Sequence, residues 1–205
     1  MSTPAYKLIT KRLLIRCYEP QDAYLLKNAI DESLDHFLPW LPWAENEPEE
    51  INKKIQRLRR FRADFDLDKN YVYGIFPPDE SILIGTIANK KTIGKKAREI
   101  GYWINKRCIN NGYATEATSA ITKVAFEVDE VERVEIHCAN KNKKSSAIPK
   151  KLRFKREAII RRNDKEENGD RKKDEIWIMF KEDYIRSDLI NYQVDAFDAI
   201  GDKIL

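Results

Sequence analysis

Three closely spaced strand patterns constrain the fold of this 205-residue chain more than any other feature. Apolar runs typical of strands occupy residues 71–76, 81–89 and 97–105, and short polar turns separate them. Parallel neighbours need a long crossover, usually a helix, which these connections cannot contain. The three strands are therefore predicted to form an antiparallel meander within a larger sheet.

Helical and strand patterns flank this meander on both sides. Apolar residues at three- and four-residue steps predict helices that begin at Pro20 and after Asn111, and further helices over residues 49–65, 144–152 and in the tail 184–205. Further strands are predicted over residues 10–16, 131–139, 155–162 and 174–181. This order predicts an α+β fold: a single domain over residues 1–184, with a mixed sheet of about six or seven strands and helices on both faces. A C-terminal tail or helix follows over residues 185–205.

The composition excludes several classes of protein. No apolar run approaches the ~18 residues that a membrane span needs, and residues 1–11 lack the apolar core of a signal peptide. We therefore expect a cytoplasmic protein without a membrane segment. Its 3 cysteines and 2 histidines lack ligand spacing and predict neither a disulfide framework nor a metal site.

Positive charge is concentrated in residues 141–173. This segment contains 14 Lys and Arg and 5 Asp and Glu, a net charge of +9 in a chain whose total is +4. A block of this kind is either a solvated face or a binding site for an anion, such as a phosphate-rich cofactor, an acidic partner or nucleic acid. The sequence leaves both interpretations open.

The segment Asn110-Asn111-Gly112 lies between a predicted strand and a predicted helix. Asn and Gly enter left-handed backbone most readily, so this loop can turn sharply and point its amides at a bound anion. The free amides and the positive dipole end of the following helix would complete a phosphate cradle. The alternative is an ordinary strand-to-helix turn capped by Asn.

The residues on both sides of this loop resemble a known family. Two segments resemble motif A of the GNAT superfamily of N-acetyltransferases, in the form usual in its RimJ/RimL-like branch. They are Gly-Tyr-Trp-Ile at 101–104 and Gly-Tyr-Ala-Thr-Glu-Ala at 112–117. Asn142 and Ser145 resemble the Asn-x-x-Ser turn of that branch, which precedes a short helix ending in Leu-Gly-Phe. Segments 10–16, 38–43 and 176–180 extend the resemblance from about residue 8 to residue 184.

Three positions depart from the pattern of that family. Ile109 occupies a position that is usually Arg or Gln, and Asn110 and Arg153 occupy positions that are commonly glycine. A left-handed helix C-cap costs a residue with a side chain roughly 1 kcal/mol or more. The helix before Arg153 therefore ends in another way, or its turn is strained.

The resemblance implies a GNAT-like domain that uses acetyl-CoA as cosubstrate and no metal. The residues that it assigns to cofactor binding are Trp103, Ile104, Ile109, Asn110, Asn111, Gly112, Tyr113, Ala114, Thr115 and Asn142. It places Ser145 near the thioester sulfur as general acid and a later carboxylate, Asp164, as general base. The alternatives are a helix N-cap for Ser145 and a solvated loop position for Asp164.

The acceptor site is expected at the loop of residues 38–43. The resemblance implies that His36, Trp40 and Trp43 bind the substrate, and the alternative for both tryptophans is core packing. We expect no catalytic task for His137.

Direct transfer of the acetyl group is preferred over a cysteine intermediate. Lys106 and Arg107 could lower the pKa of Cys108, but no His or Asp partner for a nucleophilic cysteine is identifiable. Glu116, at the start of the predicted helix, is expected to be structural.

The function implied by the resemblance is acetyl-CoA-dependent acetylation of a protein N-terminal amine of the ribosomal-protein kind. Two alternatives remain: acetylation of a small amine such as an antibiotic or a polyamine, and a degenerate acyl-CoA-binding module without turnover. A weak acidic or ribosomal partner for residues 141–173 and a homodimer are further expectations.

Overall fold

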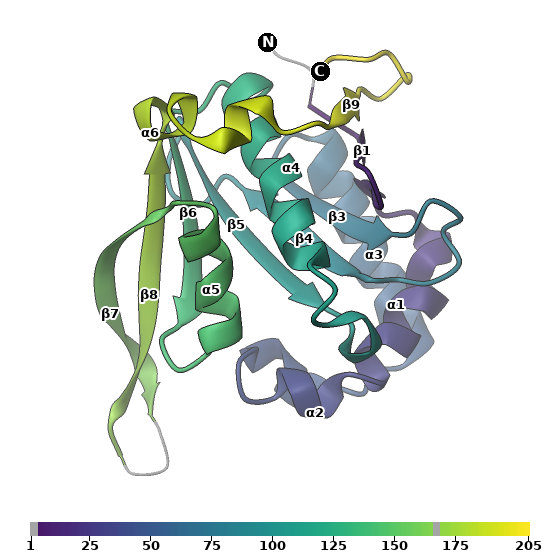
Figure 1. Cartoon of the computed structure of the whole chain (residues 1–205). Helices are drawn as coiled ribbons and strands as arrows, with labels where there is room; N and C mark the ends of the chain where they lie inside the picture. Colours follow the sequence, from purple (N-terminus) through teal and green to yellow (C-terminus); the bar gives the residue numbers. More distant parts are fainter. Residues whose placement is uncertain (1–3, 166–168) are drawn as a thin grey trace.

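A computed structural model of the chain describes residues 4–165 and 169–205 (Figure 1). The strands are β1 (Lys7–Ile9), β2 (Leu14–Cys17), β3 (Asn70–Phe76), β4 (Gly85–Lys90), β5 (Ala97–Ile104), β6 (Arg133–Ala139), β7 (Lys155–Lys165), β8 (Arg171–Phe180) and β9 (Asp195–Phe197). The helices are α1 (Ala23–Asp31), α2 (Leu34–Phe37), α3 (Ile51–Asp66), α4 (Tyr113–Glu127), α5 (Lys143–Lys151) and α6 (Lys181–Ile185), with 3-10 turns η1 (Pro20–Asp22), η2 (Pro42–Asn46), η3 (Lys106–Cys108) and η4 (Asp188–Asn191).

The predicted α+β class with one mixed sheet is confirmed. The described strands form a 9-stranded sheet in the order β7-β8-β6-β5-β4-β3-β2-β1-β9. The prediction of six or seven strands missed β1 and β9, which have 3 residues each and are too short to show an alternating pattern. The meander of β3, β4 and β5 is antiparallel as predicted.

Among the described strand pairs, only β5 and β6 are parallel. The chain crosses between them through α4, because parallel neighbours need a crossover connection. This connection brings the N-terminus of α4 close to the carboxyl end of β5 (Figure 1).

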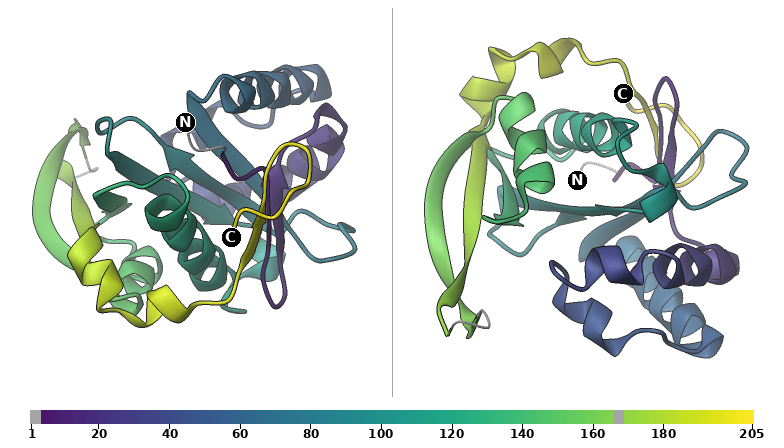
Figure 2. Two further views of the ribbon diagram at one scale, coloured as in Figure 1. Left: turned by 90° about the horizontal axis from the view of Figure 1, so that it is seen from above. Right: turned by 60° about the horizontal axis from the view of Figure 1, so that its bottom comes forward.

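Helices cover both faces of the sheet, as predicted, and each face has its own core. On one face, buried residues of α4 such as Ile121 and Val124 pack with Ile100 and Ile136 of the central strands. On the other face, α1 and α3 bury a second cluster that includes Leu58. Figure 2 shows α4 and α5 on one side of the sheet and α1 and α3 on the other.

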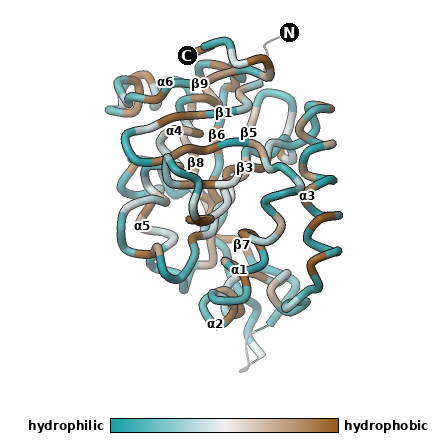
Figure 3. Tube along the Cα trace, turned by 90° about the vertical axis from the view of Figure 1, so that its right-hand side faces the viewer, coloured by the Kyte–Doolittle hydropathy of each residue, from teal (hydrophilic) through white to brown (hydrophobic). Residues whose placement is uncertain are grey.

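The helix α3 shows the amphipathic pattern that the sequence predicts over residues 49–65. Leu58 and Phe65 are buried, whereas Arg59 and Arg60 between them are exposed. Figure 3 shows this alternation of hydrophobic and hydrophilic positions along α3. None of the helices in the described ranges combines the length and the apolar character needed to cross a membrane.

Two predicted elements differ in the structure. The strand predicted over residues 10–16 begins only at Leu14, because the Thr10 amide donates a hydrogen bond to the Leu13 carbonyl (3.0 Å) and closes a tight turn between β1 and β2. Residues 185–205 do not form a terminal helix. They form η4 and then β9, whose Ala196 is fully buried beside β1.

Candidate functional site

The strands β5 and β6 separate at their carboxyl ends (Figure 1). Their paired register ends at Ile100 and Ile136, although β5 continues to Ile104 and β6 to Ala139. The strand β4 still pairs with β5 on its other edge as far as Ile104. The backbone groups of β5 beyond Ile100 that face β6 therefore have no strand partner in the described structure and can bind an extended ligand.

A pocket of about 470 Å³ lies at this opening. It brings together residues that are far apart in the sequence, from α2, β5, the loop before α4, β6 and α5. Its lining includes the predicted site residues His36, Trp40, Trp103, Ile104, Ile109, Asn110, Gly112, Tyr113, Ala114, Thr115, Asn142 and Ser145. Three predicted site residues, Asn111, Trp43 and Asp164, are not in this lining.

The loop before α4 has the sharp turn that the sequence predicts. Asn110 has φ +63° and Gly112, the N-cap residue of α4, has φ +80°. The left-handed backbone at Asn110 shows that Asn takes the place of the glycine common at that position. Tyr113, Ala114 and Thr115 of the first turn of α4 line the pocket, and the free amides of a helix N-terminus can hold an anionic group there.

An ion pair between Arg12 and Glu116 holds this loop in place. The Arg12 Nε donates to Glu116 Oε2 at 2.7 Å, and its Nη1 donates to the Asn111 carbonyl at 3.0 Å. The Thr10 hydroxyl donates to Glu116 Oε1 at 2.7 Å. Arg12 also lies over the Tyr113 ring, 4.8 Å from its centroid. Glu116 is structural as predicted, but the role of Arg12 was missed, since nothing local links two residues so distant in sequence.

The helix α5 presents Ser145 to the pocket opposite Tyr102. The Tyr102 hydroxyl donates to the Ser145 carbonyl at 3.2 Å and lies 3.4 Å from its Oγ. Burial raises the pKa of Tyr102, so it remains a hydroxyl donor near Ser145. Asn142 is the N-cap of α5, since its Oδ1 accepts from the Ser145 amide at 3.1 Å. The alternative reading of Ser145 as an N-cap is therefore wrong.

The segment around α2 forms the other wall of the pocket. His36 and Trp40 line it, and burial lowers the pKa of His36, which the charge of Lys144 lowers further. Trp43 packs instead against Phe37 and Trp103, with ring centroids 5.7 and 6.3 Å apart. These contacts agree with the alternative interpretation, in which Trp43 packs against the core instead of binding the substrate.

Asp164 lies in an adjoining cavity of about 670 Å³, between residues 38–42 and the β7–β8 hairpin. Its carboxylate pairs with Arg162 Nε at 2.8 Å and with Lys172 Nζ at 3.3 Å. Burial acts to raise the pKa of Asp164, but the hydrogen bond from Lys172 and the charge of Arg162 hold it below its ordinary value. A carboxylate held ionised in this way is a weak proton acceptor.

His137 lines the pocket, although no catalytic task was expected for it. Its Nε2 lies 2.6 Å from Oε2 of Glu135, two residues earlier on β6. The Glu135 side chain is only 9% exposed and also pairs with Arg133 Nε at 3.0 Å. The spacing of Glu135 and His137 on one strand face is a signal that could have found this pair.

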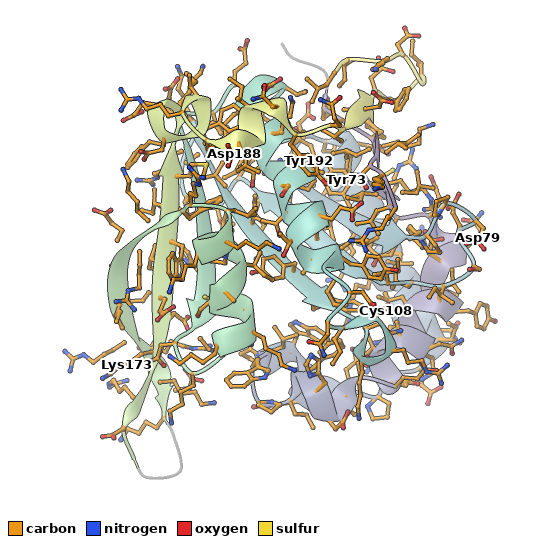
Figure 4. The ribbon with its side chains drawn as sticks, viewed as in Figure 1. Tyr73, Asp79, Cys108, Lys173, Asp188 and Tyr192 are labelled. Carbon is orange, nitrogen blue, oxygen red and sulfur yellow. The ribbon has the colours of Figure 1, made fainter. Side chains whose placement is uncertain are left out.

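The cysteines do not provide a nucleophile. Burial and the charge of Glu32 raise the pKa of the Cys108 thiol and outweigh the opposite effect of Arg107, which agrees with the preference for direct transfer. Figure 4 places Cys108 in the loop between β5 and α4. Burial likewise raises the pKa of Cys138. In the described parts of the chain, no three His, Cys, Asp or Glu side chains are grouped so that they could hold a metal ion.

Comparisons with known proteins agree with this geometry. Residues 12–155 match the acetyltransferase (GNAT) domain family. The chain is 32% identical over 159 residues to the putative ribosomal N-acetyltransferase YdaF of Bacillus subtilis. This matching region covers 75% of this chain and 83% of that protein. It is 24% identical over 166 residues to the ribosomal protein uS5-alanine N-acetyltransferase of Escherichia coli, covering 78% and 84% of the two chains.

A solved structure of RimL, a ribosomal L7/L12 α-N-protein acetyltransferase in complex with coenzyme A, has the same fold. The TM-score is 0.76 at 16% identity, over 85% of this chain and 97% of that one. Fold and site thus define the class of the protein, which is an N-acetyltransferase. The chain belongs to the GNAT acetyltransferase family, and its relatives include ribosomal-protein N-acetyltransferases, as the resemblance to the RimJ/RimL-like branch predicted.

Proposed function

We propose that this protein uses acetyl-CoA to acetylate the α-amine of a protein N-terminus, of the ribosomal-protein kind, in the cytoplasm. The observation that carries the proposal is the pocket at the opening between β5 and β6, with the N-terminus of α4 at one end and the α2 segment at the other. Acetyl-CoA supplies an activated acetyl thioester. The coenzyme A bound to the RimL structure and the names of the relatives support this choice of cosubstrate and acceptor.

The residues of the loop and of α4 are suited to hold the pyrophosphate. The amides of residues 113–115 are at a helix N-terminus, where each interaction with an anion is worth about 0.3–2 kcal/mol, so several must act together. The free edge of β5 at Trp103 and Ile104 is suited to pair with the amides of the pantetheine arm.

Acetyl transfer to an amine needs three things from the protein: alignment, a neutral amine and a proton for the leaving thiolate. We assign the last task to the Ser145 hydroxyl, supported by its contact with Tyr102. An α-amine, with an ordinary pKa of about 7.7–8.0, is partly neutral near physiological pH, whereas a lysine amine at about 10.4 is not. The site can therefore act on an N-terminus with modest help.

The polyamine alternative is disfavoured by the charges near the α2 segment. A polycation would need free carboxylates. Asp35 on α2 itself pairs with Lys106, and further acids lie over residues 45–50. Two of them are already neutralised: Glu47 pairs with Lys54 and Arg57, and Glu49 also pairs with both.

An acidic ribosomal partner remains our proposal for the basic segment 141–173. This segment includes α5, β7 and the first residues of β8, and β7 is an edge strand of the sheet.

A thiol-release assay with acetyl-CoA tests the function. We expect turnover with peptides that carry a free N-terminal Ala or Ser, and none with the same peptides blocked at the N-terminus or with spermidine. Mass spectrometry should place the acetyl group on the α-amine. Turnover on spermidine or on a lysine side chain alone would contradict the proposal, and cofactor binding without any turnover would favour the binding module.

A calorimetric titration tests the cofactor site separately. The substitution Arg12→Gln removes the ion pair with Glu116 and the hydrogen bond to the Asn111 carbonyl, so it should weaken acetyl-CoA binding several-fold. Lys11→Gln, a neighbouring exposed residue outside this network, is the matched control and should bind as the wild type does. Equal affinities for all three proteins would show that Arg12 does not hold the loop.

A further inference from the structure

Both histidines of the chain line the pocket at the opening between β5 and β6. His36 enters from α2 and His137 from β6. Of the two, only His137 has a carboxylate partner at its ring, at 2.6 Å from Nε2 to Glu135. The position of this pair relative to Ser145 suggests a specific task in the transfer reaction.

The register of the sheet places His137 on the acceptor side of the opening. It is the first residue of β6 beyond the last paired position, Ile136. Glu135 lies directly opposite Glu99 of β5, so His137 shares a sheet face with Glu99 and with Trp103 further along β5. Trp103 packs against Phe37 of α2, so this face is the one toward His36 and Trp40.

Ser145 reaches the same opening from the other side. The helix α5 that carries it lies with α4 over the opposite face of the sheet (Figure 2). Ser145 contacts Tyr102, whose side chain alternates with that of Trp103 along β5 and so points to the opposite face. A thioester held in the opening would have Ser145 on one side and His137 on the other.

The contact with Glu135 fixes how the imidazole of His137 can act. An ionised carboxylate at Nε2 favours the tautomer in which Nε2 carries the proton, which leaves Nδ1 with a free lone pair. The nearly complete burial of Glu135 and its second partner, Arg133, hold the carboxylate in one geometry. This is the arrangement of a base oriented by a third group.

On the basis of the proposed function, we propose that His137, oriented by Glu135, is the proton acceptor for the amine that receives the acetyl group. His137 Nδ1 takes one proton from the acceptor ammonium. The neutral nitrogen then attacks the thioester carbonyl, the N–C bond forms and the C–S bond breaks. The nitrogen then loses a second proton, which reaches the thiolate with the help of Ser145 and gives the free thiol. His137 finally returns its own proton to solvent.

Charged groups from several elements line the pocket with His137 or lie beside it on the sheet. They are Arg133 and Glu135 on β6, Glu99 on β5 with Lys90 on β4, Asp174 on β8, Arg162 on β7, His36 on α2 and Lys144 on α5. Asp164, the base implied by the family resemblance, is outside this group and is paired with two cations. The two candidate bases therefore differ in the effect that their replacement should have on kcat.

Steady-state kinetics at saturating peptide and acetyl-CoA distinguish them. His137→Gln should lower kcat about 100-fold or more, the usual contribution of a general base. Glu135→Gln keeps the shape of the side chain and should give a smaller loss. In His137→Gln, acetyl-CoA affinity and thermal stability should match the wild type.

Two further variants complete the test. His36→Gln and Asp164→Asn should both lower kcat less than His137→Gln does, and added imidazole should restore part of the rate of His137→Ala. A kcat of His137→Gln close to that of the wild type, a larger loss in Asp164→Asn, or no rescue of His137→Ala by imidazole would overturn the inference while leaving the proposed function intact. A wild-type protein that acetylates no peptide would overturn both.

Discussion

Single residues with left-handed backbone mark two important turns of this protein. Asn110 and Arg153 have φ +63° and +64°, both at positions where the family commonly has glycine. Asn adopts this conformation readily, whereas Arg does so at a cost of roughly 1–2 kcal/mol. The structure thus answers the question that the sequence left open: α5 ends in the usual left-handed turn, and Arg153 is strained there.

The substitution Arg153→Gly should therefore stabilise the protein. We expect the free energy of unfolding to rise by about 1 kcal/mol, measured by urea denaturation, because glycine takes a positive φ without strain. Arg153 also pairs with Asp188 at 3.1 Å, but both side chains are largely exposed and the pair contributes little.

Arg153→Ala is the control for this experiment. It removes the ion pair and keeps a side chain at the left-handed position, so stability should change little. A gain from Ala as large as that from Gly would show that backbone strain is not the cause.

At the scale of elements, a buried ion pair joins α3 to the segment before it. The Lys54 and Glu47 side chains are both 0% exposed and in contact, and Arg57 also binds Glu47 at 3.1 Å. The segment between η2 and α3 is thereby held in place, next to Trp43 and the wall of the acceptor site.

Breaking this pair from one side should be strongly destabilising. Lys54→Met leaves the Glu47 carboxylate buried with one fewer partner and should lower the free energy of unfolding by about 3–5 kcal/mol. The double variant Lys54→Met/Glu47→Gln should recover part of that loss. Lys27→Met, which breaks an exposed pair with Asp31, should have little effect. A loss in the double variant equal to that in the single variant would contradict an uncompensated charge as the cause.

The same pair makes stability depend on pH. Burial acts to raise the pKa of Glu47, but the hydrogen bonds from Lys54 and from the Glu49 amide hold it below its ordinary value. A carboxyl whose folded pKa is lowered stabilises the fold above its unfolded value, about 4.3, and this stabilisation is lost as the pH falls through the folded value. Denaturation curves from pH 6 to about pH 3 should therefore converge for wild type and Glu47→Gln. Parallel curves would exclude Glu47 as a source of the acid sensitivity.

At the scale of the whole molecule, the C-terminal segment completes the core that supports the site. Leu189, Val194 and Ala196 are buried with α4, and the Tyr192 hydroxyl donates to the Glu116 carbonyl at 3.3 Å. Figure 4 shows Tyr192 beside α4. The residues after 184 are therefore part of the domain and lie behind the helix whose N-terminus faces the pocket.

Leu189→Ala tests this connection. The cavity should lower the free energy of unfolding by about 2–5 kcal/mol, measured by thermal or urea denaturation. Ile200→Ser is the matched control in the same segment, because Ile200 is 83% exposed and its replacement should be nearly neutral. Equal effects of the two substitutions would show that the segment contributes no core.

Local sequence patterns were enough to predict the meander, the helix after Asn111 and the sharp turn at residues 110–112. These features depend on local patterns: alternation, helical periodicity and residues that tolerate positive φ. The family resemblance added the cofactor site and the acetyl transfer. Contacts with distant segments decided the remaining features: the ends of β2, the short strands β1 and β9, and the path of the tail.

Only the tertiary structure could bring Arg12 to Glu116 and His36 to the same pocket as His137. Each of these pairs is separated by about a hundred residues, and no local pattern in the sequence encodes such a contact. Asp164 differs from these pairs, because its cationic partners Arg162 and Lys172 are close to it in the sequence, on two adjacent strands. Local propensity thus specified the elements and the turn, whereas the packing of the sheet decided which charged groups meet at the opening between β5 and β6.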